Sequence, residues 1–408
     1  MKNEKLRVPK LRFKEFSGEW EEKTLEKLCI KISDGIHSTP VYDELGEYYF
    51  VNGNNLKNGE IILDEKTKRV SKEEYEKHYR ELNDNTILMS INGTIGNIAF
   101  YKNEKIMLGK SASYINIETS KTNKYFISNQ LSSNKIQYFY KSELTGSTIK
   151  NLSLRTIKNT PILFPSKQEQ EKIASFLSSI DKKINQLSKK DELLQNYKKA
   201  MMQKIFSQKL RFKKEDGSDY PKWEEKKLNQ ITKVYDGTHN TPKYVKSGVP
   251  FYSVEHVTAN QFVETKYISE KVFEKENERV KLEKNDILMT RIGDIGTSKL
   301  IDWDVKASFY VSLALIKNSK KFSSSFLNQF IKSNYFQRQL YSKTLHVAFP
   351  KKINLGEIGE CLIKLPFLEE QTKIANSLSS LDTKISQNKK ALEETQKFKK
   401  ALLQKMFV

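Results

Sequence analysis

The feature that most constrains this chain is an internal repeat, because its first half recurs in its second half about 200 residues later. Residues 169–184 read EQEKIASFLSSIDKKI and residues 370–385 read EQTKIANSLSSLDTKI, with eleven of sixteen positions identical. Shorter motifs keep nearly the same offset: NTILMSINGTIG (85–96) with NDILMTRIGDIG (285–296), and DGIHSTP (34–40) with DGTHNTP (236–242). A fixed period indicates a repeated structural unit, so we expect two copies of one unit.

The two copies match unevenly along their length. The tails nearly coincide, whereas residues 41–83 and 101–150 share almost nothing with residues 243–283 and 301–350. A shared frame with two different inserts predicts one scaffold that recognises two different things. Recent duplication is the alternative explanation of the matching tails, and the diverged inserts count against it unless one insert was exchanged later.

Each tail has the apolar spacing of a long helix. Steps of four and three residues place Ile173, Leu177 and Ile180 on one seam, and Ile374 and Leu378 repeat them, as in a heptad pattern. Neither tail contains Pro or Gly, so each predicts an unbroken helix of about 40 residues, or about 60 Å. We expect the two helices to form an antiparallel coiled coil; separate packing of each helix on its own domain is the alternative.

Each tail also has a helix-start signal at its beginning and one polar residue in its apolar seam. Pro165 and Pro366 precede the helices, and Ser166 with Glu169 predicts a capping box at the first. Asp191 and Asn388 are polar residues in otherwise apolar seams, and such residues can fix the register of a helix pair.

The segments before the tails mix short β-rich runs, turn signals and helical patches. We therefore expect an α+β fold with a pseudo-twofold internal repeat. Two globular mixed α/β domains would occupy residues 1–165 and 209–366, and the long helices would occupy residues 166–208 and 367–408.

The formal net charge is +21, from 71 Lys and Arg against 50 Asp and Glu residues. Such an excess attracts polyanions, and nucleic acid is the partner that this charge favours. A generally basic proteome or a solubility effect is the alternative. No apolar run has the length of a membrane span, and residues 1–13 lack the apolar core of a signal peptide, which predicts a cytoplasmic protein.

Motifs for catalysis and metal binding are absent from the sequence. No Pro-Pro pair offers the catalytic loop of an adenine methyltransferase, and residues 109–111 (GKS) lack the first glycine of a phosphate-binding loop, where Glu104 stands. Cys29, Cys361 and the five histidines show no metal-ligand spacing. The sequence therefore predicts no catalytic, cofactor or metal site; a nuclease cluster of scattered carboxylates, which leaves no sequence motif, is the alternative.

Two loop motifs that recur in both copies contain polar side chains suited to DNA. The DG-x-H-x-TP motif contains His37, Ser38 and Thr39, then His239, Asn240, Thr241 and Lys243. Asp-Gly makes a tight turn and proline stiffens its exit. Because both copies contain this loop, an architectural role is favoured over phosphate contact, and phosphate contact over base reading.

The glycine motif offers Asn92 and Thr94 in the first copy, and Arg291 and Asp294 in the second. Glycine permits a close backbone approach, and the remaining positions differ between copies, as specificity requires. Asn92 could pair with adenine and Arg291 with guanine. The alternatives are a turn at Asn92 and a surface salt bridge at Arg291.

The polar segment before each helix, 145–158 and 345–359, supplies the remaining candidates. Four basic residues could neutralise phosphates, and three others could approach base edges: Lys150, Arg155, Lys351 and Lys352, then Ser147, Thr148 and His346. Solvated lysines at a domain edge are the alternative. The helical positions Tyr138 and Tyr140, with Gln337, Arg338 and Tyr341, are expected to belong mainly to the core.

Taken together, these motifs resemble the specificity subunits of type I restriction–modification enzymes. The resemblance covers essentially the whole chain and rests on KLRF with the following F and W (10–20), WEEKTLEKL (20–28), ILM with G-x-I-G, P with EQ-x-KIA-xx-LSS-x-D-x-KI, and the duplicated layout. It implies two target-recognition domains that read two short half-sites across an unread spacer. Readers that face the same side of the duplex would stand about 34 Å apart, so helix length would set the spacer.

The resemblance also implies partners and a division of labour. Double-stranded DNA, two methyltransferase subunits and the restriction subunits would be the partners, with no membrane involved. Those subunits would methylate adenine, cut DNA, and hold S-adenosylmethionine, ATP and Mg, while this chain would be non-catalytic.

Two other functions remain open from the sequence: a stand-alone DNA-binding regulator or architectural protein, and a coiled-coil scaffold whose charge is incidental. Glu169, Gln170 and Lys172 match across the copies, as do Lys384 and Lys405, and we interpret them as surface positions. Matching surface positions predict two equivalent sites for two copies of one partner, which favours the specificity subunit.

Overall fold

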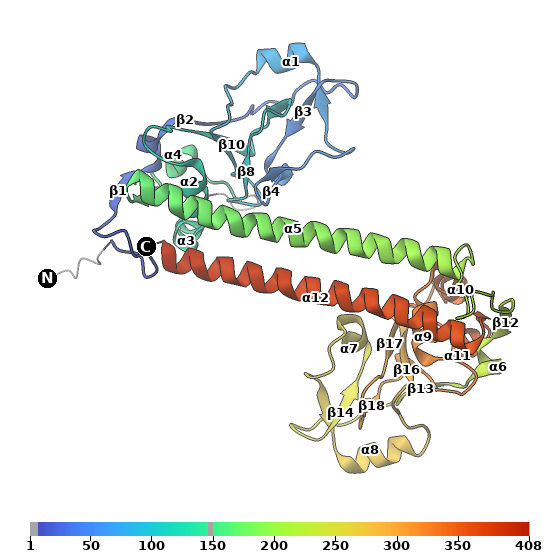
Figure 1. The fold of residues 1–408 in the computed structure, drawn as a ribbon. Helices are drawn as coiled ribbons and strands as arrows, with labels where there is room; N and C mark the ends of the chain where they lie inside the picture. The colour runs from blue at the N-terminus through green and yellow to red at the C-terminus, as the bar shows by residue number, and fades with distance from the viewer. Residues whose placement is uncertain (1–6, 146–149, 408) are drawn as a thin grey trace. The chain divides into compact units, whose positions relative to one another are not determined.

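The structure is a computed structural model that describes residues 7–145 and 150–407. The chain divides into two compact units, unit 1 with residues 1–188 and 390–408, and unit 2 with residues 189–389. Each unit contains one α+β domain and one half of each long helix (Figure 1). The α+β fold with an internal repeat is thus confirmed, and the main sheets, the smaller sheets and the long helices of the two units correspond, whereas the strand pair β4-β5 is described only in unit 1.

The main sheet of unit 1 is antiparallel, with strand order β2-β10-β7-β8. A smaller sheet, β6-β3-β9, pairs β3 with β9 in parallel. The strands of unit 1 are β1 (Glu21–Thr24), β2 (Cys29–Asp34), β3 (Tyr48–Val51), β4 (Leu56–Lys57), β5 (Glu60–Ile61), β6 (Arg69–Val70), β7 (Thr86–Ser90), β8 (Ile98–Phe100), β9 (Ile106–Leu108), β10 (Ala112–Ile117) and β11 (Pro161–Phe164).

Unit 2 repeats this plan, with the sheets β13-β19-β16-β17 and β15-β14-β18. The β14–β18 pair is parallel, as β3–β9 is in unit 1. The strands of unit 2 are β12 (Glu224–Lys227), β13 (Val234–Asp236), β14 (Val249–Tyr252), β15 (Lys266–Ile268), β16 (Ile287–Ile292), β17 (Asp294–Leu300), β18 (Ser308–Phe309), β19 (Leu313–Ile316) and β20 (Leu362–Leu365).

Short helices cover these sheets, and most begin at a serine or asparagine whose side chain caps the helix. In unit 1 they are η1 (Leu25–Leu28), η2 (Gly53–Asn55), α1 (Lys72–Lys77), α2 (Lys124–Leu131), α3 (Asn134–Ser142) and α4 (Leu154–Lys158). In unit 2 they are α6 (Leu228–Ile231), α7 (Val254–Ala259), α8 (Glu270–Asn277), α9 (Ser324–Ile331), α10 (Asn334–Lys343) and α11 (Leu355–Gly359).

The repeated ILM triplet lies on the central strand of each main sheet and is buried on both faces. In β7, Ile87 and Met89 pack into the core that includes the long helices, while Leu88 faces the core beneath the smaller sheet. In β16, Ile287 and Met289 face one core and Leu288 faces the other. Alternate residues of a strand point to opposite faces, so a strand buried on both faces requires three consecutive apolar residues.

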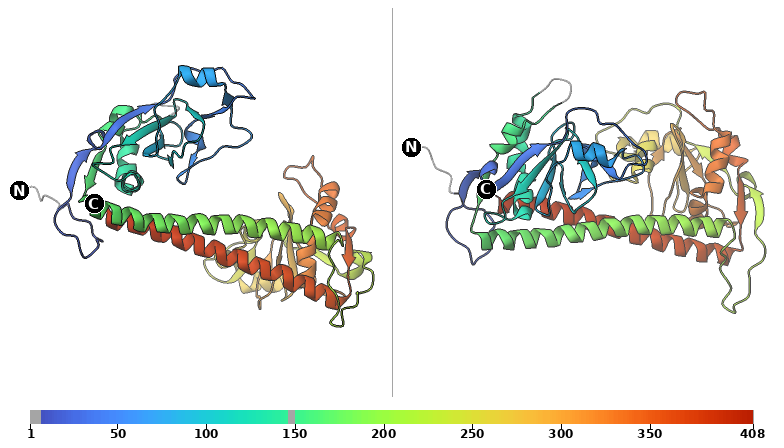
Figure 2. Two further views of the ribbon diagram at one scale, coloured as in Figure 1. Left: turned by 45° about the horizontal axis from the view of Figure 1, so that its top comes forward. Right: turned by 90° about the horizontal axis from the view of Figure 1, so that it is seen from above.

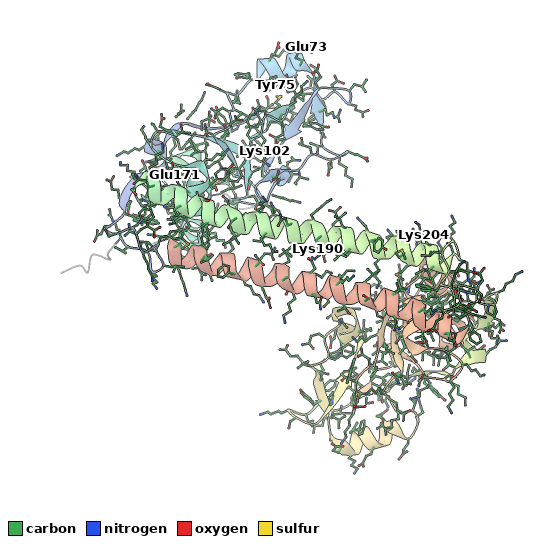
Figure 3. All side chains as sticks on the ribbon, viewed as in Figure 1. Glu73, Tyr75, Lys102, Glu171, Lys190 and Lys204 are labelled. Carbon is green, nitrogen blue, oxygen red and sulfur yellow. The ribbon has the colours of Figure 1, made fainter. Side chains whose placement is uncertain are left out.

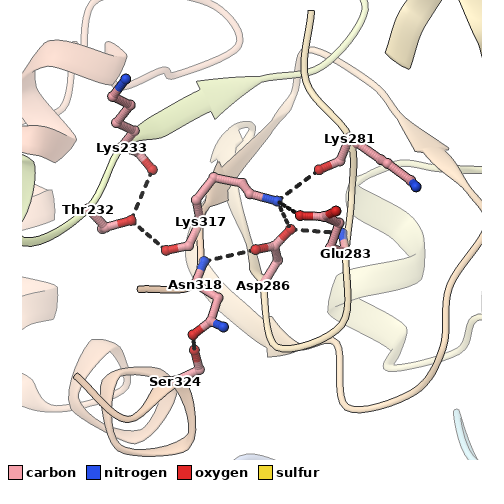
Figure 4. Close-up of polar contacts among 8 residues, drawn as sticks. All are labelled: Thr232, Lys233, Lys281, Glu283, Asp286, Lys317, Asn318 and Ser324. Carbon is pink, nitrogen blue, oxygen red and sulfur yellow. Dashed lines mark hydrogen bonds and ion pairs between the residues drawn. The ribbon is translucent and has the colours of Figure 1, made fainter. Parts of the chain in front are cut away.

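The two copies stabilise the same strand pair with different polar side chains. In unit 1, Thr86 Oγ1 donates a hydrogen bond to Asn116 Oδ1 at 2.7 Å, and both residues are buried. In unit 2, the equivalent Asp286 is buried and accepts from Lys317 Nζ at 2.6 Å (Figure 4). A neutral pair in one copy is thus a charged pair in the other.

The long helices are α5 (Lys167–Phe206) and α12 (Leu368–Met406). Within each unit, one half of α5 packs antiparallel on one half of α12 (Figure 2), joined by the ion pair Asp181–Lys399 in unit 1 and Lys198–Asp382 in unit 2. Exposed positions carry charged side chains such as Glu171, Lys190 and Lys204 (Figure 3). The predicted antiparallel pair is confirmed.

The end of each long helix also completes the core of a domain. In unit 1, Leu402, Met406 and Phe407 join the core, and the Phe407 ring lies 5.6 Å from that of Phe126. In unit 2, Ile205 and Phe206 do the same, and the Phe206 ring lies 5.2 Å from that of Phe330. The helices are therefore part of the domain cores as well as of the helix pair.

The repeated EQ motif at the start of each long helix is buried, which corrects its interpretation as a surface site. Glu169 is 1% and Glu370 0% exposed, and their carboxylates bond to Arg12 and Arg211 of the repeated KLRF motif. Gln170 accepts a hydrogen bond from Thr122 Oγ1 at 2.7 Å and is also buried. These matches are explained by internal packing. Lys172, Lys384 and Lys405, in contrast, are exposed, as interpreted.

The first helix start follows the predicted capping box only in part. The Glu169 amide donates to Ser166 Oγ at 3.4 Å, as predicted. The Glu169 carboxylate, however, is held by Arg12. Among the described residues, no helix is both long enough and apolar enough to cross a membrane.

Candidate nucleic-acid interface

In each unit, a short hairpin folds back onto the glycine motif. In unit 2, Lys352 forms bridges with Leu345 and Ile292, and the Gly293 amide donates to Lys351 O at 2.8 Å. Gly293 has φ 81°, a left-handed conformation that glycine adopts without strain. The glycine motif and the segment before the long helix, predicted separately, therefore form one structure, which we call the hairpin site.

Unit 1 builds the same hairpin site. Asn151 forms bridges with Thr145 and Asn92, and the Leu152 amide donates to Ile91 O at 2.9 Å. The predicted residues Ser147 and Thr148 lie outside the described residues. Lys150 is exposed next to Asn151, so it and Asn92 belong to one site.

A helix lies against each glycine motif, and the last glycine of the motif is required by this contact. A Cβ atom on Gly96 would lie 2.7 Å from the Gln137 side chain of α3, and one on Gly296 would lie 2.6 Å from Gln337 of α10. Gln137 Nε2 donates to Leu131 O and Gln337 Nε2 to Ile331 O, which fixes both glutamines. Helix and loop are thus positioned against each other in the same way in both units.

In unit 2 this arrangement leaves an open cleft of about 750 Å³. It is lined by the glycine motif, α10 and the hairpin: Gly293, Ile295, Asn334, Gln337, Arg338, Leu340, Tyr341, Thr344, His346 and Lys351. The expectation that the aromatic helix positions belong to the core holds for Tyr140, which is fully buried, and is wrong for Tyr138 and Tyr341, which are 76% and 70% exposed. Sequence reasoning did not place Arg338 and Tyr341 on the surface, because helical spacing alone did not assign their face.

In each DG-x-H-x-TP loop, the histidine ring forms a hydrogen bond with the carboxylate of the aspartate three residues before it. His37 Nε2 lies 2.9 Å from Asp34 Oδ2, and His239 Nε2 lies 2.9 Å from Asp236 Oδ2. Both imidazoles remain exposed beyond these contacts. Ser38, Thr39, Asn240, Thr241 and Lys243 are exposed as well, and Thr241 Oγ1 lies 3.2 Å from the Tyr310 hydroxyl.

An arginine that follows a short helix, α1 in unit 1 and α8 in unit 2, forms hydrogen bonds to the aspartate of each loop. Arg80 Nε donates to Asp34 O at 3.1 Å, and Arg279 Nη2 bonds to Asp236 through both its backbone and its carboxylate. Burial alone would raise the pKa of Asp236, but the hydrogen bond and charge of Arg279, with His239, hold it below its ordinary value. Asp236 is therefore a fixed negative charge beneath an exposed histidine.

Arg291, a candidate for reading guanine, is buried between the two loops of unit 2. Its Nε donates to Ile353 O at 3.1 Å and its Nη1 to Val311 O at 2.9 Å. Nη1 also lies 3.7 Å from Asp236 Oδ2. A contact between Arg291 and a base edge would require the loss of these bonds. In unit 1 the position is Ile91, which is equally buried.

The remaining predicted residues are accessible. Thr94, Arg155, Asp294, His346, Lys351 and Lys352 are exposed, and Asn92 is half-buried. Asp294 accepts a hydrogen bond from Thr290 Oγ1 at 2.9 Å, which orients its carboxylate. Arg155 lies on α4, which follows the hairpin of unit 1.

The residues that could hold a metal are scattered. No group of three or more His, Cys, Asp or Glu side chains converges within residues 7–145 and 150–407. Burial raises the pKa of Cys29 to about 12 and that of Cys361 to about 11, so both thiols are protonated at neutral pH. Protonated thiols are poor nucleophiles and poor metal ligands.

A family model described as the type I restriction modification DNA specificity domain matches residues 17–195 and 220–396. Of individual proteins, the MjaVIII specificity subunit of a type I restriction enzyme from Methanocaldococcus jannaschii is 30% identical over 65% of this chain and 65% of its own length, just under two thirds. The EcoBI specificity subunit from Escherichia coli is 24% identical over 76% of this chain and 70% of its own.

Solved structures show the same fold. The S subunit of a type I restriction–modification system from M. genitalium superposes with a TM-score of 0.65 and 20% identity, over 98% of this chain and 99% of that one. A chain from a study of complex assembly and conformational transition in the type I system gives a TM-score of 0.54 at 15% identity, over 95% and 97% of the two chains.

Proposed function

Because this chain belongs to the family of type I restriction modification DNA specificity domains and contains two of them, we propose that it reads a bipartite DNA target, one half-site per domain. One observation carries the proposal. Both units build the same hairpin site from the repeated frame, yet they place different side chains on its surface. The same backbone arrangement with different surface side chains is what we expect of two domains that bind DNA in the same way and recognise different bases.

Each hairpin site would divide its contacts between phosphates and bases. Lys150, Lys351 and Lys352 are exposed and would neutralise phosphates. Asn92 offers an amide that matches adenine, and Asp294 offers an acceptor that matches the cytosine amino group. The repeated His37 and His239, each oriented by an aspartate, would hold the backbone in register in both domains.

Arg291 would act as a positioning residue. Its guanidinium joins the backbone at Ile353 to the Asp236 carboxylate, so it links the hairpin to the histidine loop. A rigid link between two contact loops reduces the ordering that binding must impose.

Catalysis would reside in other subunits. In this proposal two methyltransferase subunits and the restriction subunits assemble with the chain in the cytoplasm, and they bind S-adenosylmethionine, ATP and Mg. This chain would supply sequence recognition alone, without catalytic residues or a cofactor. The exposed lysines of the paired helices, such as Lys384 and Lys405, would be available to those partners.

Mapping of adenine methylation would test the proposal. The chain is co-expressed with its modification subunits, and the methylated positions in host DNA are determined. One motif of two short half-sites with a fixed gap is the expected result. Exchange of residues 224–365 for another insert should then change one half-site and leave the other intact.

The charged residues of the hairpin site make a second test. Lys351→Gln and Lys352→Gln should weaken binding to all sequences and should each lower the slope of log affinity against log salt by about one. Lys320→Gln, an exposed lysine before α9, is the matched control and should leave that slope nearly unchanged. Tight binding of one DNA sequence without any methylation would instead favour a stand-alone regulator.

A further inference from the structure

The hairpin of unit 2 ends in an apolar tip that the proposed base contacts do not use. Val347 and Phe349 are fully exposed, and Leu345 is 41% exposed on the same hairpin. Single exposed apolar side chains are common, but an aromatic ring with no packing at all beside a second bare apolar residue is unusual. The tip follows α10 and extends beyond the helices and sheets of its unit, as the orange-red loop in Figure 2 shows.

The base of this hairpin is held firmly. Leu345 donates to Lys352 O at 2.8 Å, and the Ile353 amide donates to Arg291 O at 3.0 Å. Next to Leu345, His346 Nε2 lies 2.9 Å from Tyr341 O of α10, and the rings of His346 and Tyr341 lie 4.4 Å apart. A tip on a fixed base presents its apolar side chains without the entropy cost of ordering a loose loop.

The surroundings of the tip are basic and polar. Lys351 and Lys352 follow Phe349 after Pro350 and are exposed, and Arg338 lines the adjoining cleft. Of the nearby acids, Glu357 pairs with Lys343 at 3.0 Å, while Asp294 accepts from Thr290 and remains exposed. An apolar tip between cations is complementary to a duplex, whose phosphates flank stacked apolar bases.

We propose that Phe349 is an apolar wedge that enters the DNA duplex and unstacks one base step of the half-site read by the second domain. This inference rests on the proposed function. Lys351 and Lys352 would hold the flanking phosphates, while the ring would replace the stacking of the opened step. Val347 would widen the wedge on the same tip.

An aromatic wedge would belong to the second domain alone. At the corresponding place in the first copy, residues 146–149 read GSTI in the sequence and contain no aromatic residue. The half-site of the second domain would therefore be read with unstacking by an aromatic ring, and its sequence preference would include the ease with which that step opens.

The test uses the full-length chain with its co-expressed modification partners and the duplex that this assembly selects from a random-sequence pool. 2-Aminopurine is placed in turn at each position of the half-site assigned to residues 224–365, and its fluorescence reports unstacking. Wild-type protein should raise the fluorescence at one step other than the methylated adenine, which methyltransferases take out of the stack in any case. Phe349→Ala should abolish that rise and weaken binding roughly 5- to 100-fold, whereas Phe349→Leu should retain much of both.

Val263→Ala is the matched control, because Val263 is 83% exposed on another loop of unit 2. It should change neither fluorescence nor affinity. Phe349 is fully exposed, so its variants should unfold at the wild-type temperature, and this is checked first.

Four results would overturn the wedge. If Phe349→Ala binds the selected duplex as wild type does, or if no step is unstacked, the wedge is wrong and the bipartite reader stands. If Phe349→Ala binds DNA normally but loses a partner subunit, the tip docks a protein. If wild-type protein selects no duplex, the proposed function fails together with the wedge.

Discussion

The guanidinium of Arg12 holds the buried carboxylate of Glu169 by two hydrogen bonds, from Nε at 2.8 Å and from Nη2 at 2.7 Å. Arg211 and Glu370 repeat the pair in unit 2, with bonds of 3.1 and 2.7 Å. The segment that leads into each domain is thus fastened to the first turn of the long helix that follows it. This fork-shaped contact requires arginine, because lysine presents a single point charge.

Loss of the arginine should destabilise its unit strongly. Arg211→Ala leaves Glu370 buried without its charged partner, so we expect the free energy of unfolding of unit 2 to fall by about 3–5 kcal/mol. Arg211→Lys should cost less, since it keeps the charge. Trp223 reports the change in urea titrations because its Nε1 donates to Glu370 at 3.1 Å. Lys209→Ala, exposed two residues away, should leave the curve unchanged.

The Asp286–Lys317 pair of unit 2 should be replaceable by the Thr86–Asn116 pair of unit 1 only when both residues are changed together. Lys317→Asn leaves Asp286 buried without its cation and should cost about 3–5 kcal/mol, whereas Asp286→Thr leaves Lys317 paired with Glu283 and should cost less. The double variant recreates the Thr86–Asn116 pair of unit 1 and should recover most of that loss. Thermal unfolding of the four proteins gives the coupling energy; additive effects would contradict the prediction.

Acid should remove the contribution of Asp236. A carboxyl whose pKa is lower in the folded protein adds stability above its ordinary value of 3.8, and this stability is lost as the pH falls through the lowered value. At neutral pH, Asp236→Asn should cost about 1–3 kcal/mol. The difference between wild type and variant should shrink below pH 3.8 in urea titrations. Asp304→Asn, at an exposed carboxyl, should show little difference at any pH.

The end of α12 should matter for unit 1. Phe407 is buried against Trp20 and Phe126, so Phe407→Ala should lower the stability of unit 1 by about 3–5 kcal/mol. Phe398→Ala removes a ring that is 54% exposed and should change stability by less than about 0.5 kcal/mol. Hydrogen exchange of β7 and β16 would locate the effect: exchange should accelerate in β7 only.

Some of this structure follows from sequence pattern. Ile173, Leu177 and Ile374 could be assigned to a helix pair because a heptad seam is a local pattern that survives any tertiary setting. The glycine motifs could be assigned to tight loops because few other residues accept a positive φ, which Gly93 and Gly293 both adopt.

Other features depend on partners far along the chain. Glu169 was interpreted as a surface residue, since a glutamate is rarely buried; its burial depends on Arg12, 157 positions away. The exposure of Tyr341 and the enclosure of Arg291 depend on how the hairpin folds onto the glycine motif. Helical spacing identifies a face but not what covers it. The roles assigned to the DNA-binding candidates therefore stay predictions.

The participation of Leu402, Met406 and Phe407 in the core of unit 1 bears on how the protein is made. The domain that leaves the ribosome first is the last to be completed, because its final core residues, from Leu402 on, are translated 238 or more positions after Phe164, the end of its last strand (402 − 164 = 238). Until then the surface around Trp20 and Phe126 lacks its cover. We expect a prematurely terminated chain to expose that apolar surface to chaperones and proteases, and so to be removed before half a reader can accumulate on DNA.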